Sequence, residues 1–228
     1  EQFLRLLSNT PLQVNIDLIR IDNQAPKNTP AAHMDNFYVN FDDVANKKYD
    51  GLIVTGAPLA HLAYQDVKYW ETMTVVMDRA LRDQKLSGVY RHFVQNEHDE
   101  LLRGFDPAFY APQSRYGEIS MADYASIPGL NVLAKSDEGG AYIVASEDKR
   151  LVFVTGHPEY DADSLKQEYQ RDLSTNGQPQ IPVNYFVDND PSKEPMVNWR
   201  AHGSLLFTNW LNYYVYQNTP YDLDQLSE

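Results

Sequence analysis

The sequence predicts a doubly wound α/β fold, a sheet with helices on both faces, together with an antiparallel excursion. Apolar runs with the pattern of strands alternate along the chain with segments of helical periodicity. The short apolar run at 50–56 ends in glycine, as a buried parallel strand does before a loop at the carboxyl edge of a sheet, and a further predicted strand, at 151–154, is also followed by glycine. Residues 137–140, Asp-Glu-Gly-Gly, have the composition of a hairpin turn between two further strands.

The individual elements follow from the spacing of apolar residues. Alternating or continuous apolar residues predict strands at 12–21, 52–55, 89–94, 130–134, 141–145 and 151–154. Apolar residues at helical spacing predict helices at 66–81, 161–173 and 198–217. Polar segments rich in Pro, Gly or Asp predict loops at 23–30, 82–88 and 176–195. Residues 1–9 have the pattern of an amphipathic helix from the first residue on, without a helix start signal, so we expect further chain before Glu1.

Composition limits the classes of protein to which the chain can belong. Its 228 residues suit one α/β domain, because about 100 to 200 residues per domain is usual and α/β folds often exceed it. A formal charge of −13 disfavours nucleic acid as a partner, since such binding depends on Lys and Arg neutralising phosphates. No run of about 18 apolar residues occurs, so we expect no membrane span.

The sequence contains no cysteine, which excludes disulfides and thiolate metal sites within these residues. The six histidines are scattered without metal-ligand spacing, so we expect no metal site and no bound cofactor. A protein without disulfides is typical of the cytoplasm, which is the compartment we expect.

The most informative segment for chemistry follows the strand predicted at 151–154. His157 lies directly after the strand, at the edge where open α/β sheets bind ligands. Pro158 favours extended backbone at His157, and residues two apart in extended chain project to one side, so Glu159 is expected beside the imidazole. A carboxylate there fixes the tautomer of a catalytic histidine. The alternative is a His-Pro turn with a solvated glutamate.

Four further places have both a functional and an ordinary interpretation. Gly56-Ala57 ends a predicted strand and could present backbone N–H groups to an oxyanion, or form an ordinary βα turn. Lys85, Ser114 and Arg171 are candidate substrate contacts, or simply solvated side chains of two loops and a helix. The aromatic residues of the last helix, among them Trp199, Trp210 and Tyr214, are expected in the core.

Several long blocks, in order along nearly the whole chain, resemble the homoserine O-succinyltransferase (homoserine transsuccinylase) family, which includes O-acetyltransferases. The blocks are 2–9 (QFLRLLSN), 50–58 (DGLIVTGAP), 85–90 (KLSGVY), 154–161 (VTGHPEYD) and 205–216 (LLFTNWLNYYVY). The resemblance implies a glutamine-amidotransferase-like (flavodoxin-like) fold. It also implies acyl transfer from acyl-CoA to the hydroxyl of L-homoserine in methionine biosynthesis, through a cysteine thioester.

The resemblance also assigns roles to individual residues. His157 would be the general base and Glu159 the carboxylate that orients it. Lys85, Ser114 and Arg171 match substrate-binding positions. Ala60 matches the position linked to acyl-donor choice, where Gly accompanies succinyl-CoA and Glu accompanies acetyl-CoA. Because alanine is small and uncharged, succinyl-CoA is favoured as the donor.

The sequence departs from the family pattern at the nucleophile. The family carries a cysteine on a strand, elbow and helix of about two dozen residues, expected here between Leu81 and Lys85, and a further strand before Glu1; neither is present. Three hypotheses remain open. In the first, the chain belongs to an acyltransferase and these segments are missing from the sequence. Its acceptor would be homoserine or L-serine, and the enzyme could form a homodimer. In the second, the chain is a non-catalytic CoA- or ligand-binding remnant. Or it is a related hydrolase or amidotransferase whose nucleophile is another residue, such as Ser87 or Ser114.

Overall fold

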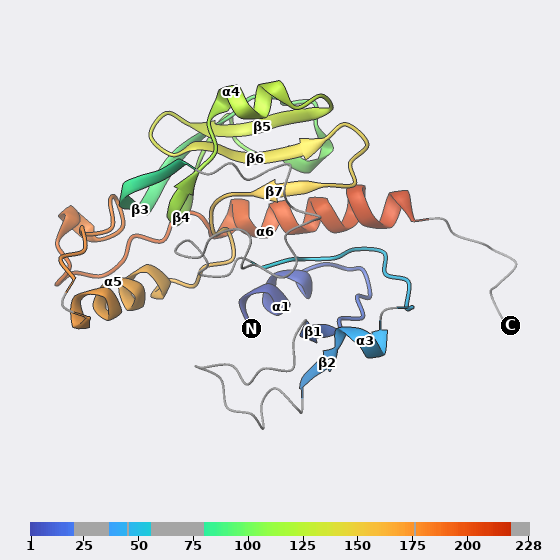
Figure 1. Ribbon diagram of the computed structural model, residues 1–228, viewed down its shortest axis with the longest axis horizontal. Helices are drawn as coiled ribbons and strands as arrows, with labels where there is room; N and C mark the ends of the chain where they lie inside the picture. The colour runs from blue at the N-terminus through green and yellow to red at the C-terminus, as the bar shows by residue number, and fades with distance from the viewer. Residues whose placement is uncertain (21–36, 45, 56–79, 176, 220–228) are drawn as a thin grey trace, which may run out of the picture. The chain divides into compact units, whose positions relative to one another are not determined.

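A computed structural model describes residues 1–20, 37–44, 46–55, 80–175 and 177–219 (Figure 1). It divides the chain into two compact units, one of residues 10–54 and one of residues 1–9 and 55–228. Whether the two units make up the single domain predicted from the sequence stays a prediction. The helix predicted over 66–79 lies outside the described residues.

The larger unit is built on a five-stranded sheet in the order β4-β3-β5-β6-β7 (Figure 1). Each neighbouring pair of strands in this sheet is antiparallel. The strands are β3 (Ala80–Val94), β4 (Ala108–Glu118), β5 (Leu130–Ser136), β6 (Gly140–Ser146) and β7 (Val152–Val154). The predicted antiparallel excursion is therefore confirmed, and the mixture of helices and sheets agrees with the predicted α/β class.

Strand β3 is longer than the sequence predicts. The helix predicted to end at Leu81 and the loop predicted over 82–88 are both wrong at this place, because the strand begins at Ala80. It pairs with β4 from Ala80 to Phe93, with a register shift between Leu81 and Leu86. The polar run 82–85 has no strand pattern of its own and lies in this irregular stretch, so the pairing of the residues on either side keeps it within the strand.

The β5–β6 hairpin forms as predicted, and Gly140 in its turn has φ +69°. The helices of the larger unit are α1 (Gln2–Leu7), η3 (Glu100–Leu102), α4 (Met121–Ser126), α5 (Ser164–Ser174), η4 (Val187–Asn189), α6 (Arg200–Asn209), η5 (Trp210–Val215) and η6 (Tyr216–Asn218). Helices α1, α5 and α6 with its continuation η5 and η6 agree with the predicted helices.

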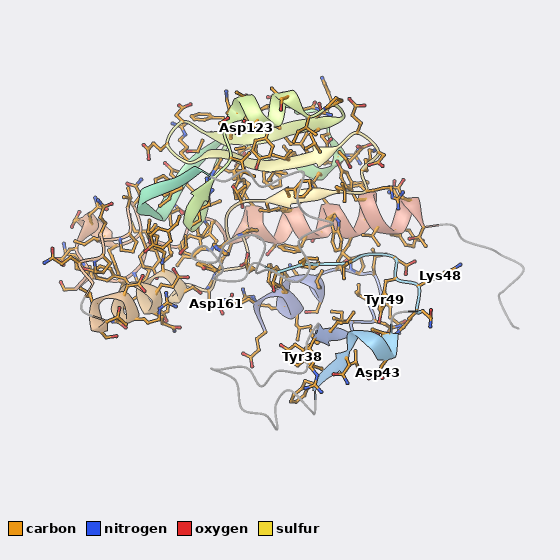
Figure 2. All side chains as sticks on the ribbon, viewed as in Figure 1. Tyr38, Asp43, Lys48, Tyr49, Asp123 and Asp161 are labelled. Atoms are coloured by element: carbon orange, nitrogen blue, oxygen red, sulfur yellow. The ribbon has the colours of Figure 1, made fainter. Side chains whose placement is uncertain are left out.

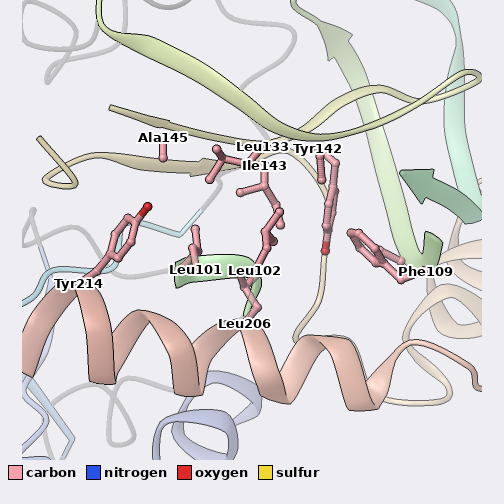
Figure 3. Packing of buried hydrophobic residues seen from close by; sticks show 11 residues of the cluster. Leu101, Leu102, Phe109, Leu133, Tyr142, Ile143, Ala145, Leu206 and Tyr214 are labelled. Atoms are coloured by element: carbon pink, nitrogen blue, oxygen red, sulfur yellow. The ribbon is translucent and has the colours of Figure 1, made fainter. Parts of the chain in front are cut away.

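The main core lies between the sheet and α6. Leu206 and Tyr214, on one face of α6 and η5, pack against Leu133 and Ile143 of the central strands (Figure 3). Ile143 has no exposed surface and Leu133 is 1% exposed. Each such side chain contributes about 1.5–3 kcal/mol by its removal from water, so this layer holds the helix to the sheet.

The smaller unit contains two short parallel strands, β1 (Leu18–Arg20) and β2 (Tyr38–Asn40), and α3 (Phe41–Val44). The strand predicted over 12–21 forms only at 18–20. The run 52–55 was predicted as a buried strand, but it has no strand structure, and Leu52 and Val54 are 69% and 65% exposed. A strand buried on both faces requires paired neighbours, and no described segment pairs with this one.

The part of the chain that the structure describes contains no helix that is both long enough and apolar enough to cross a membrane.

Candidate active site

The loop after β7 holds His157 through two backbone hydrogen bonds. The N–H of Thr155 donates to the carbonyl of Tyr142 on β6, at 3.0 Å, and the N–H of His157 donates to the carbonyl of Pro112 on β4, at 2.9 Å. Strand β4 lies at the edge of the sheet, where a proline is tolerated and its carbonyl is free to accept. His157 is therefore fixed to two strands of the sheet.

The predicted pairing of His157 with Glu159 is present, but the extended backbone expected for it is not: residues 158–159 form a turn, in which the N–H of Tyr160 donates to the carbonyl of His157 at 3.2 Å. The imidazole Nδ1 lies 2.8 Å from Oε1 of Glu159. Because a carboxylate only accepts, Nδ1 carries the proton and Nε2 keeps its lone pair. The side chain of Glu159 is 9% exposed and that of His157 is 30% exposed. The imidazole is thus oriented from a buried side and reachable from solvent.

Close packing around this loop depends on two glycines. A Cβ added to Gly156 would lie 2.6 Å from the carbonyl oxygen of Pro112 and 2.7 Å from the ring of Tyr142. A Cβ added to Gly203 of α6 would lie 2.5 Å from the carbonyl oxygen of Pro158. The absence of side chains at these positions lets β4 and α6 approach the His-Pro turn.

Tyr160 joins the imidazole to a second group of polar side chains. Its ring stacks on the imidazole of His157, with centroids 4.2 Å apart and planes 15° apart. Its hydroxyl donates to Oε1 of Glu168 on α5, at 2.5 Å. Burial and the neighbouring carboxylate of Glu168 raise the pKa of Tyr160, so its hydroxyl remains a donor at neutral pH.

Glu168 is the centre of that second group. Its Oε2 accepts from the hydroxyl of Ser114 at 2.5 Å and from Nζ of Lys85 at 3.0 Å. Burial alone would raise the pKa of Glu168, but the hydrogen bonds from Ser114, Tyr160 and Lys85 outweigh it and lower the pKa overall. Glu168 is therefore ionised at neutral pH.

The group continues along α5 to Asp172, one turn further. Lys85 Nζ also lies 3.2 Å from Oδ2 of Asp172. Arg171 binds Oδ1 of the same carboxylate through Nε at 3.1 Å and Nη2 at 3.0 Å, and its side chain is 64% exposed. Lys85, Arg171, Glu168 and Asp172 thus place two positive and two negative charges together.

Helix α1 also contacts the loop after β7. Arg5 donates through Nη2 to the carbonyl of Glu159 at 3.1 Å and forms an ion pair with Asp161, the residue labelled in Figure 2. Gln2 donates to Asp161 and to Ser164 at the start of α5. The contacts of α1 therefore fix the backbone directly after the His157–Glu159 pair.

The structure brings together most of the candidate residues from the sequence. His157 and Glu159 form one pair, and Lys85, Ser114 and Arg171 meet around Glu168 and Asp172. Two of these residues were predicted on loops, and that was wrong: Lys85 lies on β3 and Ser114 on β4. Gly56, Ala57 and Ala60 lie outside the described residues.

Sequence reasoning missed Tyr160, Glu168 and Asp172. Glu168 and Asp172 are four residues apart, the spacing that puts two side chains on one face of a helix, and this was the available signal. Within the described ranges, no group of three His, Asp or Glu side chains is arranged to hold a metal ion.

Comparisons with known proteins agree with one family. The sequence pattern of homoserine O-succinyltransferase matches residues 1–83 and 77–221. Proteins named homoserine O-succinyltransferase are 65% identical in Pseudoalteromonas atlantica, over 99% of this chain and 82% of that protein, and 62% identical in Alteromonas mediterranea, over 100% and 81%. The Vibrio atlanticus protein of the same name is 49% identical over 100% of this chain and 81% of its own.

Solved structures that align with part of this chain include two glutamine amidotransferases. That of Thermotoga maritima is 10% identical, with a TM-score of 0.42 over 68% of this chain and 60% of its own. That of Methylobacillus flagellatus is 15% identical, with a TM-score of 0.38 over 59% and 55%. Similarity of this extent concerns the fold alone. The sequence pattern and the three relatives show that the chain belongs to the homoserine O-succinyltransferase family, a family of acyltransferases.

Proposed function

We propose that the protein transfers an acyl group from acyl-CoA to the side-chain hydroxyl of L-homoserine, for methionine biosynthesis. The observation that carries the proposal is the 2.8 Å contact between Nδ1 of His157 and the buried carboxylate of Glu159. This is the arrangement of a general base held by an orienting acid. The names of the relatives support homoserine as the acceptor and a succinyl group as the acyl group.

The geometry gives His157 the means to move a proton. With Nδ1–H bound to Glu159, Nε2 is the basic atom, and no described residue forms a hydrogen bond with it. Glu159 stabilises the imidazolium that forms when Nε2 takes a proton. General base catalysis of this kind contributes about 10²- to 10⁴-fold to a rate.

In the proposed reaction, His157 serves two half-reactions. A cysteine thiol gives its proton to Nε2, its sulfur bonds to the acyl carbon, and the bond to the sulfur of CoA breaks, so that CoA leaves with the proton. The hydroxyl of homoserine then gives its proton to Nε2 and attacks the thioester. The cysteine sulfur leaves and takes the proton back, and O-acyl homoserine is released.

The cysteine is not among the 228 residues, and we propose that it belongs to a segment that relatives carry between Leu81 and Lys85. The family pattern matches in two segments, and these meet at residues 77–83. The alignment with the Pseudoalteromonas protein has 253 positions, whereas this chain has 228 residues, so at least 25 positions of the relative have no counterpart here. That length suits one strand, an elbow and a helix.

The charges around Glu168 suit an acceptor that is a zwitterion. An α-amino acid presents a carboxylate and an ammonium group, and the cluster offers cations at Lys85 and Arg171 and anions at Glu168 and Asp172. The hydroxyl of Ser114 lies in the same group. The charges of the cluster suit L-serine equally well, so an assay with both amino acids must distinguish homoserine from the shorter serine as the acceptor.

The acyl donor is proposed from the sequence around Gly56, Ala57 and Ala60. Alanine at position 60 is small and carries no carboxylate to repel the free carboxylate of a succinyl group. Gly56 and Ala57 are proposed to offer backbone N–H groups to the oxyanion. The donor is a co-substrate rather than a resident cofactor. The cytoplasm is the proposed compartment, because the sequence contains no cysteine and therefore no disulfide.

The test uses the full-length enzyme encoded by the gene, with its intact mass measured first. Succinyl-CoA and acetyl-CoA are each offered with L-homoserine and L-serine, and we expect the fastest release of CoA thiol with succinyl-CoA and homoserine. His157→Ala and Glu159→Gln should lower kcat by about 100-fold or more. His98→Ala, at an exposed histidine, is the matched control and should leave kcat unchanged.

Other outcomes of this test identify the alternatives. CoA binding without turnover by a polypeptide of the calculated mass would indicate a non-catalytic binder. The serine hydrolase has less support, because the hydroxyl of Ser114 donates to Glu168 and Ser87 lies within β3 rather than on an elbow. A serine-reactive probe that labels the protein would restore it. Size-exclusion chromatography of the same sample tests the homodimer.

A further inference from the structure

We propose that Tyr160 is a positioning residue, which fixes the plane of the His157 imidazole and couples it to the Glu168 cluster. The inference rests on the proposed function, in which His157 is the general base. It follows from one juxtaposition: the ring of Tyr160 covers one face of the imidazole while its hydroxyl binds Glu168.

The stack restrains a motion that Glu159 does not control. The hydrogen bond from Nδ1 to Glu159 fixes one edge of the imidazole, but a single bond allows the ring to tilt about it. A phenol ring 4.2 Å away and 15° from parallel blocks that tilt on one face. Nε2, the atom that takes the proton, then keeps one direction.

Tyr160 can restrain its neighbour because it is itself held at several atoms. Its hydroxyl donates to Glu168 at 2.5 Å, and its N–H donates to the carbonyl of His157 at 3.2 Å. Its own carbonyl accepts from Nε1 of Trp199 at 3.0 Å, and Trp199 is 1% exposed. The ring also packs against a buried cluster of Val89, Leu165, Tyr185, Phe186 and Trp199.

The ring and the hydroxyl of Tyr160 therefore have separable effects. Removing the hydroxyl leaves the stack on His157 and takes one of three hydrogen bonds from Glu168, in the cluster proposed for the acceptor. Removing the aromatic ring takes away the restraint on the base. The first change should affect KM for the acceptor, and the second should affect kcat.

The experiment compares Tyr160→Phe and Tyr160→Met in the full-length enzyme. Phenylalanine keeps the stack, whereas methionine fills similar space with a flexible chain. We expect Tyr160→Met to lower kcat by about 10-fold or more with little change in KM for homoserine, because misplaced catalytic groups have effects of that order. Tyr160→Phe should raise that KM about 3- to 10-fold, the size of one lost hydrogen bond, with kcat nearly unchanged.

A spectroscopic measurement shows the stack without reference to activity. The ring current of Tyr160 shifts the carbon-bound protons of the His157 imidazole, which are assigned in NMR spectra by comparison with His157→Ala. These signals should stay in place in Tyr160→Phe and move in Tyr160→Met. Tyr216→Phe and Tyr216→Met, at a tyrosine that is 61% exposed, are the matched controls and should change neither kcat nor these signals.

Each result either supports or overturns the assignment. A methionine variant with moved His157 signals and an unchanged kcat overturns it. A phenylalanine variant with unmoved signals and a tenfold lower kcat also overturns it, and this holds even where the methionine variant does not fold. A wild-type enzyme without acyl transfer would reject the proposed function, while the NMR comparison would still show whether Tyr160 fixes the imidazole.

Discussion

Replacing Gly203 with alanine tests whether close approach of α6 to the His-Pro turn matters more than helix propensity. Gly203 is buried in the first half of α6. An added Cβ would lie 2.5 Å from the carbonyl oxygen of Pro158 and 3.3 Å from its carbonyl carbon. Both neighbours are backbone atoms of a loop that other contacts hold, so relief requires the helix or the loop to move.

The two effects have opposite signs. Alanine within a helix is favoured over glycine by about 1 kcal/mol. Overpacking of a close contact costs about 1–3 kcal/mol. We therefore expect Gly203→Ala to lower the free energy of unfolding by about 1 kcal/mol, which in a chain of this size lowers Tm by about 2–4 °C. Since Pro158 follows His157, kcat should fall by about tenfold through displacement of the base.

Urea unfolding followed by circular dichroism measures the first quantity, and the CoA-release assay measures the second. Ala201→Gly, at an exposed position of the same helix, is the control for propensity and should cost about 1 kcal/mol. If Gly203→Ala is instead about 1 kcal/mol more stable than the wild type, and fully active, the contact with Pro158 does not limit packing and the argument is refuted.

Two further predictions concern the core. Ile143→Ala should lower the free energy of unfolding by about 2–5 kcal/mol, because it leaves a cavity, whereas Leu151→Ala, at a side chain 55% exposed, should change it by less than about 0.5 kcal/mol; equal losses in the two variants would contradict the assigned core. Burial lowers the pKa of His92 to about 4 from 6.5, so between these pH values the unfolded chain takes up a proton that the folded chain does not. The free energy of unfolding should therefore decrease as the pH is lowered from 6.5 to 4, by about 3 kcal/mol in total. His92→Phe should reduce the slope of stability against pH in this range; an unchanged slope in this variant would show that other groups cause it.

The parts of the site that depend on local sequence could be predicted. The pairing of His157 with Glu159 was predicted, although the two side chains meet within a turn at 158–159 rather than along extended backbone, and a turn is still a property of a short segment. The hairpin at 137–140 and helix α5 also follow from local patterns, a glycine turn and apolar spacing. In each case the interacting groups are close in sequence, so the local sequence determines the conformation.

The parts that depend on distant pairing could not be predicted. Residues 82–85 are charged or polar and have the pattern of a loop. They lie within β3 because the flanking residues Leu81 and Leu86 both pair with β4, although 82–85 themselves fall in the irregular stretch between these pairs. Strand β4 itself contains Pro112, which argues against a strand except at a sheet edge. The converse case is 52–55, a strand by pattern that lacks a described neighbour to pair with.

The meeting of Lys85, Ser114 and Glu168 has the same cause. These residues belong to β3, β4 and α5, and no spacing along the chain indicates that they share one group of hydrogen bonds. Family resemblance selected Lys85 and Ser114 but gave no role to the glutamate between them. The fold therefore brings Glu168, the common hydrogen-bond acceptor, to both residues, which the sequence alone does not reveal.

The indole of Trp199 gives this protein a built-in optical reporter. It is buried, and its N–H donates to the backbone carbonyl of Tyr160, directly after the His157–Glu159 pair. Light emission from a buried indole lies at shorter wavelength and responds to small changes around the ring. Occupation of the neighbouring cluster by an amino acid should then be visible as a change in intrinsic fluorescence, without any label, and should disappear when Trp199 is replaced by phenylalanine.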